Sequence, residues 1–149
     1  MLMRPPEAGP VNGARLVTGP MLILGAGGFL GLNTVRACLA AGHQPLCGRR
    51  SRGNVLGLRA LNVATRITDF DDVDSLAAAM AGIAVVIHAA AHYPRFSDEP
   101  EVTLARGLRE LENVLEAAAR AGVCRLVFVS STATIAPRAD GRPSAPGYS

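Results

Sequence analysis

The chain has 149 residues, of which 49% are apolar, and its formal net charge is +3. That length fits one domain, and the apolar share excludes an intrinsically disordered chain. All fifteen basic residues are arginines, so within these residues a Walker-type lysine, a Schiff-base lysine and a Tyr-x-x-x-Lys dyad are excluded.

The two ends of the chain differ in composition from its middle. Residues 1–20 hold Pro, Gly and Asn but no apolar secretion signal, so we expect a flexible leader and a cytoplasmic protein. Residues 21–137 are expected to form the domain, and the proline-rich residues 138–149 a loop. No apolar run is long enough for a membrane span, and the small net charge gives no case for nucleic-acid binding.

Between these ends, short apolar runs alternate with segments of helical periodicity. The apolar runs predict strands over residues 21–24, 44–48, 63–67, 83–87 and 126–129. The periodic segments predict helices over residues 28–41, 56–61, 72–81 and 101–121. Because strand and helix alternate, the sequence predicts an α/β fold, with a parallel sheet covered by helices on both faces and ending after about strand five.

Two of these helices carry apolar residues along one side. In helix 28–41 the residues near one face are Phe29, Leu32, Val35, Cys38 and Leu39. In helix 101–121 they are Leu104, Leu108, Leu111, Val114, Leu115 and Ala118. Such stripes are typical of helices that pack on a core. The three cysteines, which include Cys47 and Cys124, are interpreted as buried apolar residues in a reducing compartment.

A glycine-rich loop joins the first predicted strand to the first helix. Glycine stands at Gly25, Gly28 and Gly31, while Leu30 occupies the last glycine position of Gly-x-Gly-x-x-Gly. In such loops one glycine permits the turn, one lets the backbone approach a pyrophosphate, and one lets helix and strand pack closely. The helix N-terminus then offers free N–H groups to phosphate. We therefore predict nucleotide binding; the alternative is a structural turn that needs small residues.

The end of the second predicted strand is basic. Arg49 and Arg50 stand where NAD-selective sites usually place an acid, and residues 8–68 contain seven arginines and no acid. A guanidinium can bind a ribose 2′-phosphate with two hydrogen bonds. This pattern favours NADP over NAD; the alternative is a solvated basic turn.

Several motifs in order resemble the extended short-chain dehydrogenase/reductase superfamily. The closest pattern is that of its NAD-dependent epimerase/dehydratase and dihydroflavonol-reductase-like branch. The motifs are the glycine loop LGAGGFLG, the segment Thr68–Leu76, the segment IHAAA at 87–91, NVLEAA at 113–118 followed by AGV at 121–123, and VSSTAT at 129–134. The resemblance covers roughly residues 21–137 and implies a Rossmann-type, doubly wound sheet.

The resemblance also assigns cofactor contacts. It places Phe29 and Leu30 in the phosphate-binding loop and implies that Asp69 hydrogen-bonds the adenine amino group while Phe70 flanks the ring. The backbone of Ala89, Ala90 and Ala91 would lie along the ribose on the nicotinamide side. Ser130 would also contact the cofactor.

One catalytic residue follows from the same resemblance. The third position of Ser130-Ser131-Thr132 corresponds to the catalytic serine or threonine of the superfamily, which gives the role to Thr132. Its hydroxyl would hydrogen-bond the substrate oxygen while a tyrosinate moves the proton. Ser131 takes the role if the register differs by one residue, and the alternative is that these hydroxyls cap a strand end.

The sequence departs from the superfamily at three places. Gly107 and Glu110 occupy places where an asparagine usually supports the catalytic lysine, and Ala136-Pro137 replaces Tyr-Gly. The Tyr-x-x-x-Lys dyad is absent, and Tyr148 is interpreted as a loop tyrosine. No residues have metal-ligand spacing.

These observations lead to a functional hypothesis with one alternative. We expect the NAD(P)-binding portion of an epimerase, dehydratase or reductase, inactive as this chain alone. A small-molecule substrate would be bound only with a C-terminal part present, and a homodimer is left open. The alternative is a non-catalytic module that senses NADP and signals to a protein partner.

Overall fold

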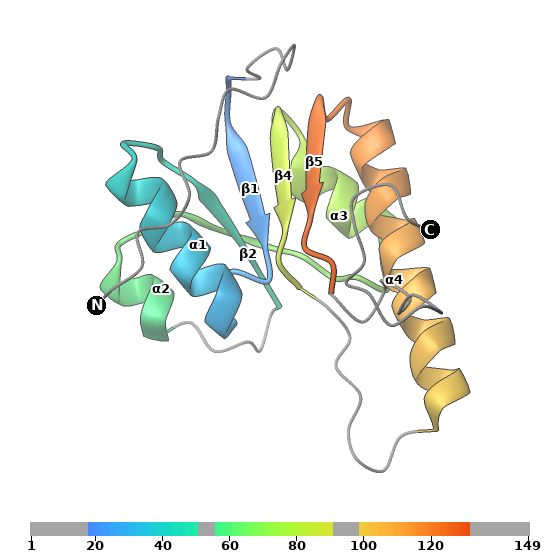
Figure 1. Cartoon of the computed structure of the whole chain (residues 1–149). Helices are drawn as coiled ribbons and strands as arrows, with labels where there is room; N and C mark the ends of the chain where they lie inside the picture. Colours follow the sequence, from blue (N-terminus) through green and yellow to red (C-terminus); the bar gives the residue numbers. More distant parts are fainter. Residues whose placement is uncertain (1–17, 51–55, 91–98, 132–149) are drawn as a thin grey trace, which may run out of the picture.

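The computed structural model describes residues 18–50, 56–90 and 99–131. They contain a five-stranded sheet of order β3-β2-β1-β4-β5, in which all neighbours pair in parallel (Figure 1). The strands are β1 (Met21–Leu24), β2 (Leu46–Arg49), β3 (Thr65–Ile67), β4 (Val85–His88) and β5 (Arg125–Phe128). The predicted parallel sheet is confirmed: β1 has the predicted bounds, and the other four strands differ by one or two residues at one or both ends. Strand β2 begins only at Leu46, since the preceding proline has no N–H to donate to a neighbouring strand.

Four helices cover the two faces of the sheet. They are α1 (Phe29–Ala40), α2 (Leu56–Ala60), α3 (Val73–Met80) and α4 (Pro100–Arg120). Helices α1 and α2 lie on one face, and α3 and α4 lie on the other (Figure 1). This arrangement confirms the doubly wound, Rossmann-type fold.

Successive residues of β1 point into two different cores. Ile23 packs with Val35 and Leu58 between the sheet and helices α1 and α2. Its neighbours Leu22 and Leu24 pack into the larger core under α3 and α4. Side chains alternate between the faces of a strand, so an unbroken apolar run is needed where both faces are covered.

Helix α4 buries only part of the predicted stripe, namely Val114 and Ala118. Its buried residues are Glu110, Val114, Ala117 and Ala118. Leu104, Leu108 and Leu115 of the predicted stripe are 64%, 52% and 50% exposed. The first half of α4 extends past the carboxyl ends of the strands (Figure 1), so its leucines have no sheet beneath them. The predicted packing surface is therefore confirmed at Val114 and Ala118 and wrong at Leu104, Leu108 and Leu115.

Two further expectations about burial are corrected. Phe29 is 88% exposed, because it is the first residue of α1 and the packed face begins with Leu32, one turn later. Cys47 is buried as predicted, but Cys124 is exposed in the turn that leads into β5. Among the helices that the structure describes, none is both long enough and apolar enough to cross a membrane.

Candidate functional site

The strand order creates a crevice at the carboxyl ends of β1 and β4. From β1 the chain builds outward through β2 and β3, and it then returns to the other side of β1 to build β4 and β5. The last residues of the central strands, Leu24 and His88, are paired, and the Ala89 N–H donates to the Leu24 carbonyl at 3.1 Å. In open α/β sheets, ligands bind in this crevice, where the strand order reverses.

The glycine loop enters this crevice directly from β1. Gly25 has a φ of +75°, a backbone conformation that favours glycine, and its carbonyl accepts from the Gly28 N–H at 3.0 Å. A Cβ on Gly31 would lie 2.1 Å from the Gly25 carbonyl oxygen, so no side chain fits there. The turn and the close helix–strand contact expected of these glycines are therefore both present.

The N-terminus of α1 is open to an anion. Gly28 is its N-cap, no side chain caps the helix, and its first turn holds no acid. Gly27 and Gly28 are exposed, so a ligand can reach the loop. The first N–H groups of a helix lack partners within the helix and carry partial positive charge. This end of α1 fits the pyrophosphate of a dinucleotide.

Two arginines follow β2 at the same edge of the sheet. Arg49 is half-buried; its Nε donates to Thr65 Oγ1 at 3.3 Å and its Nη1 to the Arg50 carbonyl at 3.4 Å. Arg50 is exposed. The residues that follow, 51–55, lie outside the described part of the chain. Two positively charged side chains therefore lie at the end of β2, the strand beside β1.

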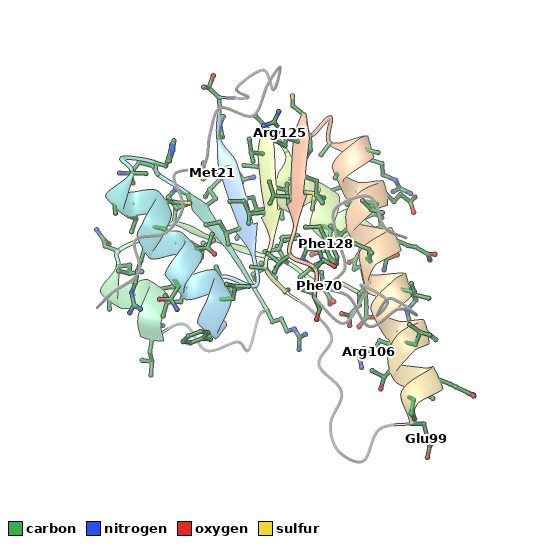
Figure 2. All side chains as sticks on the ribbon, in the orientation of Figure 1. Met21, Phe70, Glu99, Arg106, Arg125 and Phe128 are labelled. Atoms are coloured by element: carbon green, nitrogen blue, oxygen red, sulfur yellow. The ribbon has the colours of Figure 1, made fainter. Side chains whose placement is uncertain are left out.

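The segment after β3, residues 68–71, lies beside these arginines and is called here the β3 segment. The Thr68 N–H donates to the Arg49 carbonyl at 2.9 Å. Asp69 is exposed, and its carboxylate accepts from the Asp71 N–H at 3.1 Å. Phe70, which the resemblance places beside the adenine ring, is only 7% exposed and packs in the core under α3 and α4 (Figure 2). A ligand at this place would meet the backbone of Phe70 rather than the face of its ring.

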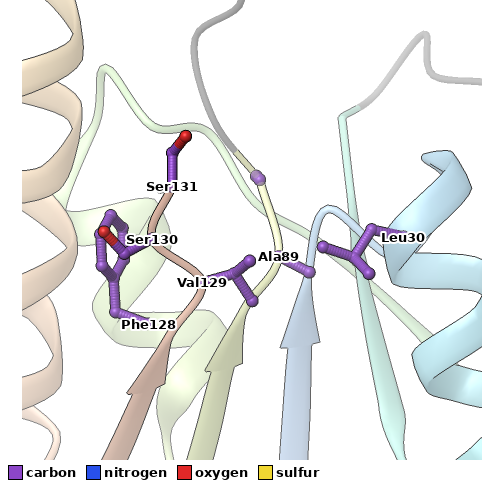
Figure 3. Close-up of a pocket in the computed structure, with 7 residues that line it drawn as sticks. Leu30, Ala89, Phe128, Val129, Ser130 and Ser131 are labelled. Atoms are coloured by element: carbon purple, nitrogen blue, oxygen red, sulfur yellow. The ribbon is translucent and has the colours of Figure 1, made fainter. Parts of the chain in front are cut away.

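A pocket of about 300 Å³ lies on the side of the glycine loop away from the β3 segment. It is lined by Leu30, Ala89, Ala90, Phe128, Val129, Ser130 and Ser131, which come from the start of α1 and from the ends of β4 and β5 (Figure 3). Figure 3 shows Leu30 and Val129 on opposite sides of Ala89. The structure therefore brings four of the predicted residues, Leu30, Ala89, Ala90 and Ser130, to one cavity. Ala91 and Thr132 lie outside the described residues.

A buried histidine separates the β3 segment from this pocket. The ring of His88 stacks on Phe70 at 5.6 Å between centroids and meets Phe128 in a tilted contact at 5.4 Å. Its Nδ1 is buried without a hydrogen-bond partner. Burial lowers the pKa of His88, and the nearby Glu110 carboxylate partly opposes this. A neutral, packed ring suits this environment.

Two polar features near the site concern α3 and α4. The Asp72 carboxylate caps α3 by accepting from the N–H groups of Asp74 and Ser75 at 2.9 and 3.1 Å. Asn113 of α4 donates from Nδ2 to the Phe70 carbonyl at 2.8 Å, and the sequence analysis gave this residue no role.

Within the described ranges, no cluster of three or more His, Cys, Asp or Glu side chains could hold a metal.

Comparison with known proteins bears on the cofactor and the family. The model of the NAD dependent epimerase/dehydratase family matches residues 21–147. A candidate dihydroflavonol 4-reductase from Synechocystis sp. is 31% identical over 126 residues, which make up 85% of this chain and 36% of that protein.

Solved structures agree with that match. The crystal structure of a nucleoside-diphosphate-sugar epimerase from Pseudomonas aeruginosa is 27% identical with a TM-score of 0.73, covering 87% of this chain and 39% of that one. A short-chain dehydrogenase/reductase superfamily protein from Agrobacterium tumefaciens, solved with bound NAD, is 25% identical with a TM-score of 0.59, covering 74% and 32%.

The chain spans about a third of the length of the curated relatives it matches. The matched part carries the glycine loop and the crevice, so a nicotinamide dinucleotide is the cofactor that this part of the fold accommodates. The extended short-chain dehydrogenase/reductase resemblance is confirmed, and the chain belongs to the NAD-dependent epimerase/dehydratase family.

Proposed function

We propose that this chain binds NADP and forms the cofactor portion of an epimerase, dehydratase or reductase. The substrate would be a nucleotide sugar or a small molecule with a carbonyl or hydroxyl group. The observation that carries the proposal is the uncapped N-terminus of α1, which opens into the crevice on the same sheet edge as Arg49 and Arg50.

Each part of the cofactor has a place in this proposal. The pyrophosphate lies on the loop of Gly25, Gly28, Phe29, Leu30 and Gly31. Adenine lies on the β3 segment, where Asp69 accepts from its amino group and Phe70 contributes its backbone. The ribose on the nicotinamide side lies along Ala89, Ala90 and Ala91, with Ser130 beside the pocket.

The chemistry itself belongs to the bound cofactor, since nicotinamide accepts or donates a hydride. The chain contributes a hydroxyl at the end of β5. Thr132 would hydrogen-bond the substrate oxygen and orient it, and Ser131, which lines the pocket, would take this role if the register differs by one residue.

The preference for NADP rests on charge at the end of β2. Residues 8–68 hold no acid that could bind an unmodified ribose 2′-hydroxyl and repel a 2′-phosphate. The guanidinium of Arg49 is close to that edge, and the exposed Arg50 adds a second positive charge. The Agrobacterium relative was solved with NAD, so we infer the preference from these two residues rather than from the family.

Titration of the chain with NADPH and NADH tests this proposal. Calorimetry is expected to show NADPH bound about tenfold more tightly or better, the effect of one charge-assisted contact. The double variant Arg49→Ala/Arg50→Ala is expected to weaken NADPH selectively, because NADH lacks the ribose 2′-phosphate that these arginines would bind. Arg59→Ala, which removes an exposed arginine of α2, is the control. Equal affinities in the unmodified chain would refute the NADP preference.

We also infer that these 149 residues bind the cofactor without turning over substrate. In this superfamily a tyrosine and a lysine move the proton, and the chain contains no lysine. The same absence favours the alternative function, a non-catalytic module that senses NADP for a protein partner. Both proposals need the cofactor site, so the titration above tests their common part.

A further inference from the structure

The β3 segment is connected to α4, a helix distant in sequence, through a partly buried side chain. We propose that Asn113 is a positioning residue that holds the adenine side of the cofactor site in place. This inference rests on the proposed binding of a dinucleotide, and it adds a residue that touches neither cofactor nor substrate.

The contact is a single directed hydrogen bond between distant parts of the chain. Asn113 Nδ2 donates to the Phe70 carbonyl at 2.8 Å across 43 residues of sequence, in a partly buried setting. The orientation of the Asn113 amide follows from its partner. In the flipped orientation, its Oδ1 would face the Phe70 carbonyl oxygen, and two acceptors repel each other. Without this donor, the Phe70 carbonyl would lose its side-chain partner at the edge of the core.

The bond matters because of what lies on either side of Phe70. Before it, Thr68 donates to Arg49 at 2.9 Å and Asp69 stands exposed at the sheet edge. The Phe70 ring is fixed against His88 at 5.6 Å. Asn113 fixes the carbonyl of the same residue, so the ring and the peptide are both held. The Asp69 carboxylate is thereby presented at a defined place beside the crevice.

Other contacts between α4 and this segment are weaker. Asp71 faces Arg106 at 3.4 Å and Arg109 at 3.5 Å, and all three side chains are about half exposed or more. Arg106 also pairs with Glu110 at 3.0 Å. Exposed ion pairs of this length contribute little, because water and salt screen them. The partly buried hydrogen bond from the Asn113 amide is therefore the contact expected to set the position of the β3 segment.

The test compares two ligands, NADPH and reduced nicotinamide mononucleotide, which lacks the adenosine half. The variant is Asn113→Asp, which keeps the shape but cannot donate, and Asn113→Ala serves as a second variant without the added charge. We expect both to weaken NADPH about tenfold, the effect of losing one partly buried hydrogen bond, and to leave the mononucleotide unchanged. Arg109→Gln, which removes an exposed ion pair to the same segment, is the control and should bind both ligands normally.

The outcomes separate this inference from the proposed function. Thermal unfolding of each variant establishes that it is folded at the assay temperature. Unchanged NADPH affinity in folded Asn113→Ala would overturn the positioning role. Equal weakening of both ligands would also overturn it, because it would mean a general loss of structure. Failure of the unmodified chain to bind NADPH would instead refute the proposed function, and this inference with it.

Discussion

Gly31 is the residue whose side-chain size is most tightly limited at the crevice. A Cβ there would lie 2.1 Å from the Gly25 carbonyl oxygen and 2.8 Å from the Ala26 Cα. Both atoms are backbone, so a methyl group can be accommodated only by moving α1 away from the loop. Gly107 in α4 is a contrasting case, because a Cβ there meets nothing within 4 Å.

We therefore expect Gly31→Ala and Gly107→Ala to change stability in opposite directions. Gly31→Ala should lower the free energy of unfolding by about 1–3 kcal/mol through overpacking. Gly107→Ala should raise it by about 0.5–1 kcal/mol, because alanine is favoured over glycine inside a helix. Urea unfolding followed by circular dichroism measures both. A Gly31→Ala chain as stable as the unmodified one would contradict the observed packing of α1 on the loop.

His88 gives the fold a pH dependence that can be worked out from its surroundings. The groups that face it are the rings of Phe70 and Phe128 and the Glu110 carboxylate. Burial holds its pKa below the ordinary value of about 6.5, so near that pH the unfolded chain binds a proton that the folded chain does not. Stability should therefore fall as pH drops below about 6.5.

The measurement is the free energy of unfolding at several pH values between about 7 and 5. In His88→Phe the ring stays aromatic and cannot titrate, so the dependence in this range should become smaller. His43→Gln removes an exposed histidine and should leave the dependence as it is. A steeper loss of stability in His88→Phe than in the unmodified chain would refute the assignment.

The sequence predicted the roles of some single residues but not of others. The spacing of Gly25, Gly28 and Gly31 after an apolar run predicted the loop, because turn, approach and packing each require glycine. Asn113 could not be identified in this way. Its partner lies 43 residues earlier in the chain, and only the packing of α4 brings the two together.

Helix α4 and strand β5 leave apolar side chains uncovered. On α4 these are Leu104, Leu108 and Leu115, and at the end of β5 they are Val127 and Phe128. Strand β5 pairs only with β4 among the strands that the structure describes, so its other edge also presents backbone groups. An exposed strand edge beside apolar surface is a common route to self-association.

We expect the 149-residue chain to self-associate through this surface. Leu104→Glu/Leu108→Glu places charge on the exposed stripe of α4 and should lower the weight-average mass in sedimentation experiments. Leu56→Glu changes an exposed leucine on α2, on the opposite face of the sheet, and should have no such effect. Equal effects of both variants would mean that association is not specific to α4.

The periodicity of the helices and strands was more informative about their existence than about their contacts. Apolar runs predicted all five strands, since a strand covered on both faces needs apolar residues throughout. The stripe on α4 predicted the burial of Val114 and Ala118, but three of its leucines are exposed. Val114 and Leu115 are neighbours in sequence, yet the first is buried and the second is half exposed, as the sheet lies under one of them only.

At the scale of the whole molecule, we expect cofactor binding to be separate from catalysis. The crevice, the uncapped end of α1 and the pocket are formed by residues 18–50, 56–90 and 99–131. The proton-transfer pair of the superfamily needs a lysine that this chain does not have. This chain should therefore bind the cofactor without catalysing a reaction.

We accordingly expect NADPH to bind while no substrate is reduced, epimerised or dehydrated by this chain. The assay follows NADPH absorbance and product formation with nucleotide sugars and small ketones. Thr132→Ala is the matched variant, and it should change neither signal. Turnover by the unmodified chain that is lost in Thr132→Ala would contradict this prediction and would locate the catalytic hydroxyl at the same time.

The sequence by itself determined the class of fold, the glycine loop and the positive charge after β2. These features depend on local order: alternating elements, residues at fixed spacing, and the absence of acids over residues 8–68. The tertiary structure decided which faces are buried, that the Phe70 ring belongs to the core, and that Asn113 reaches the β3 segment. The physical reason is that burial and long-range hydrogen bonds depend on how elements far apart in sequence pack, and spacing along the chain carries no record of that.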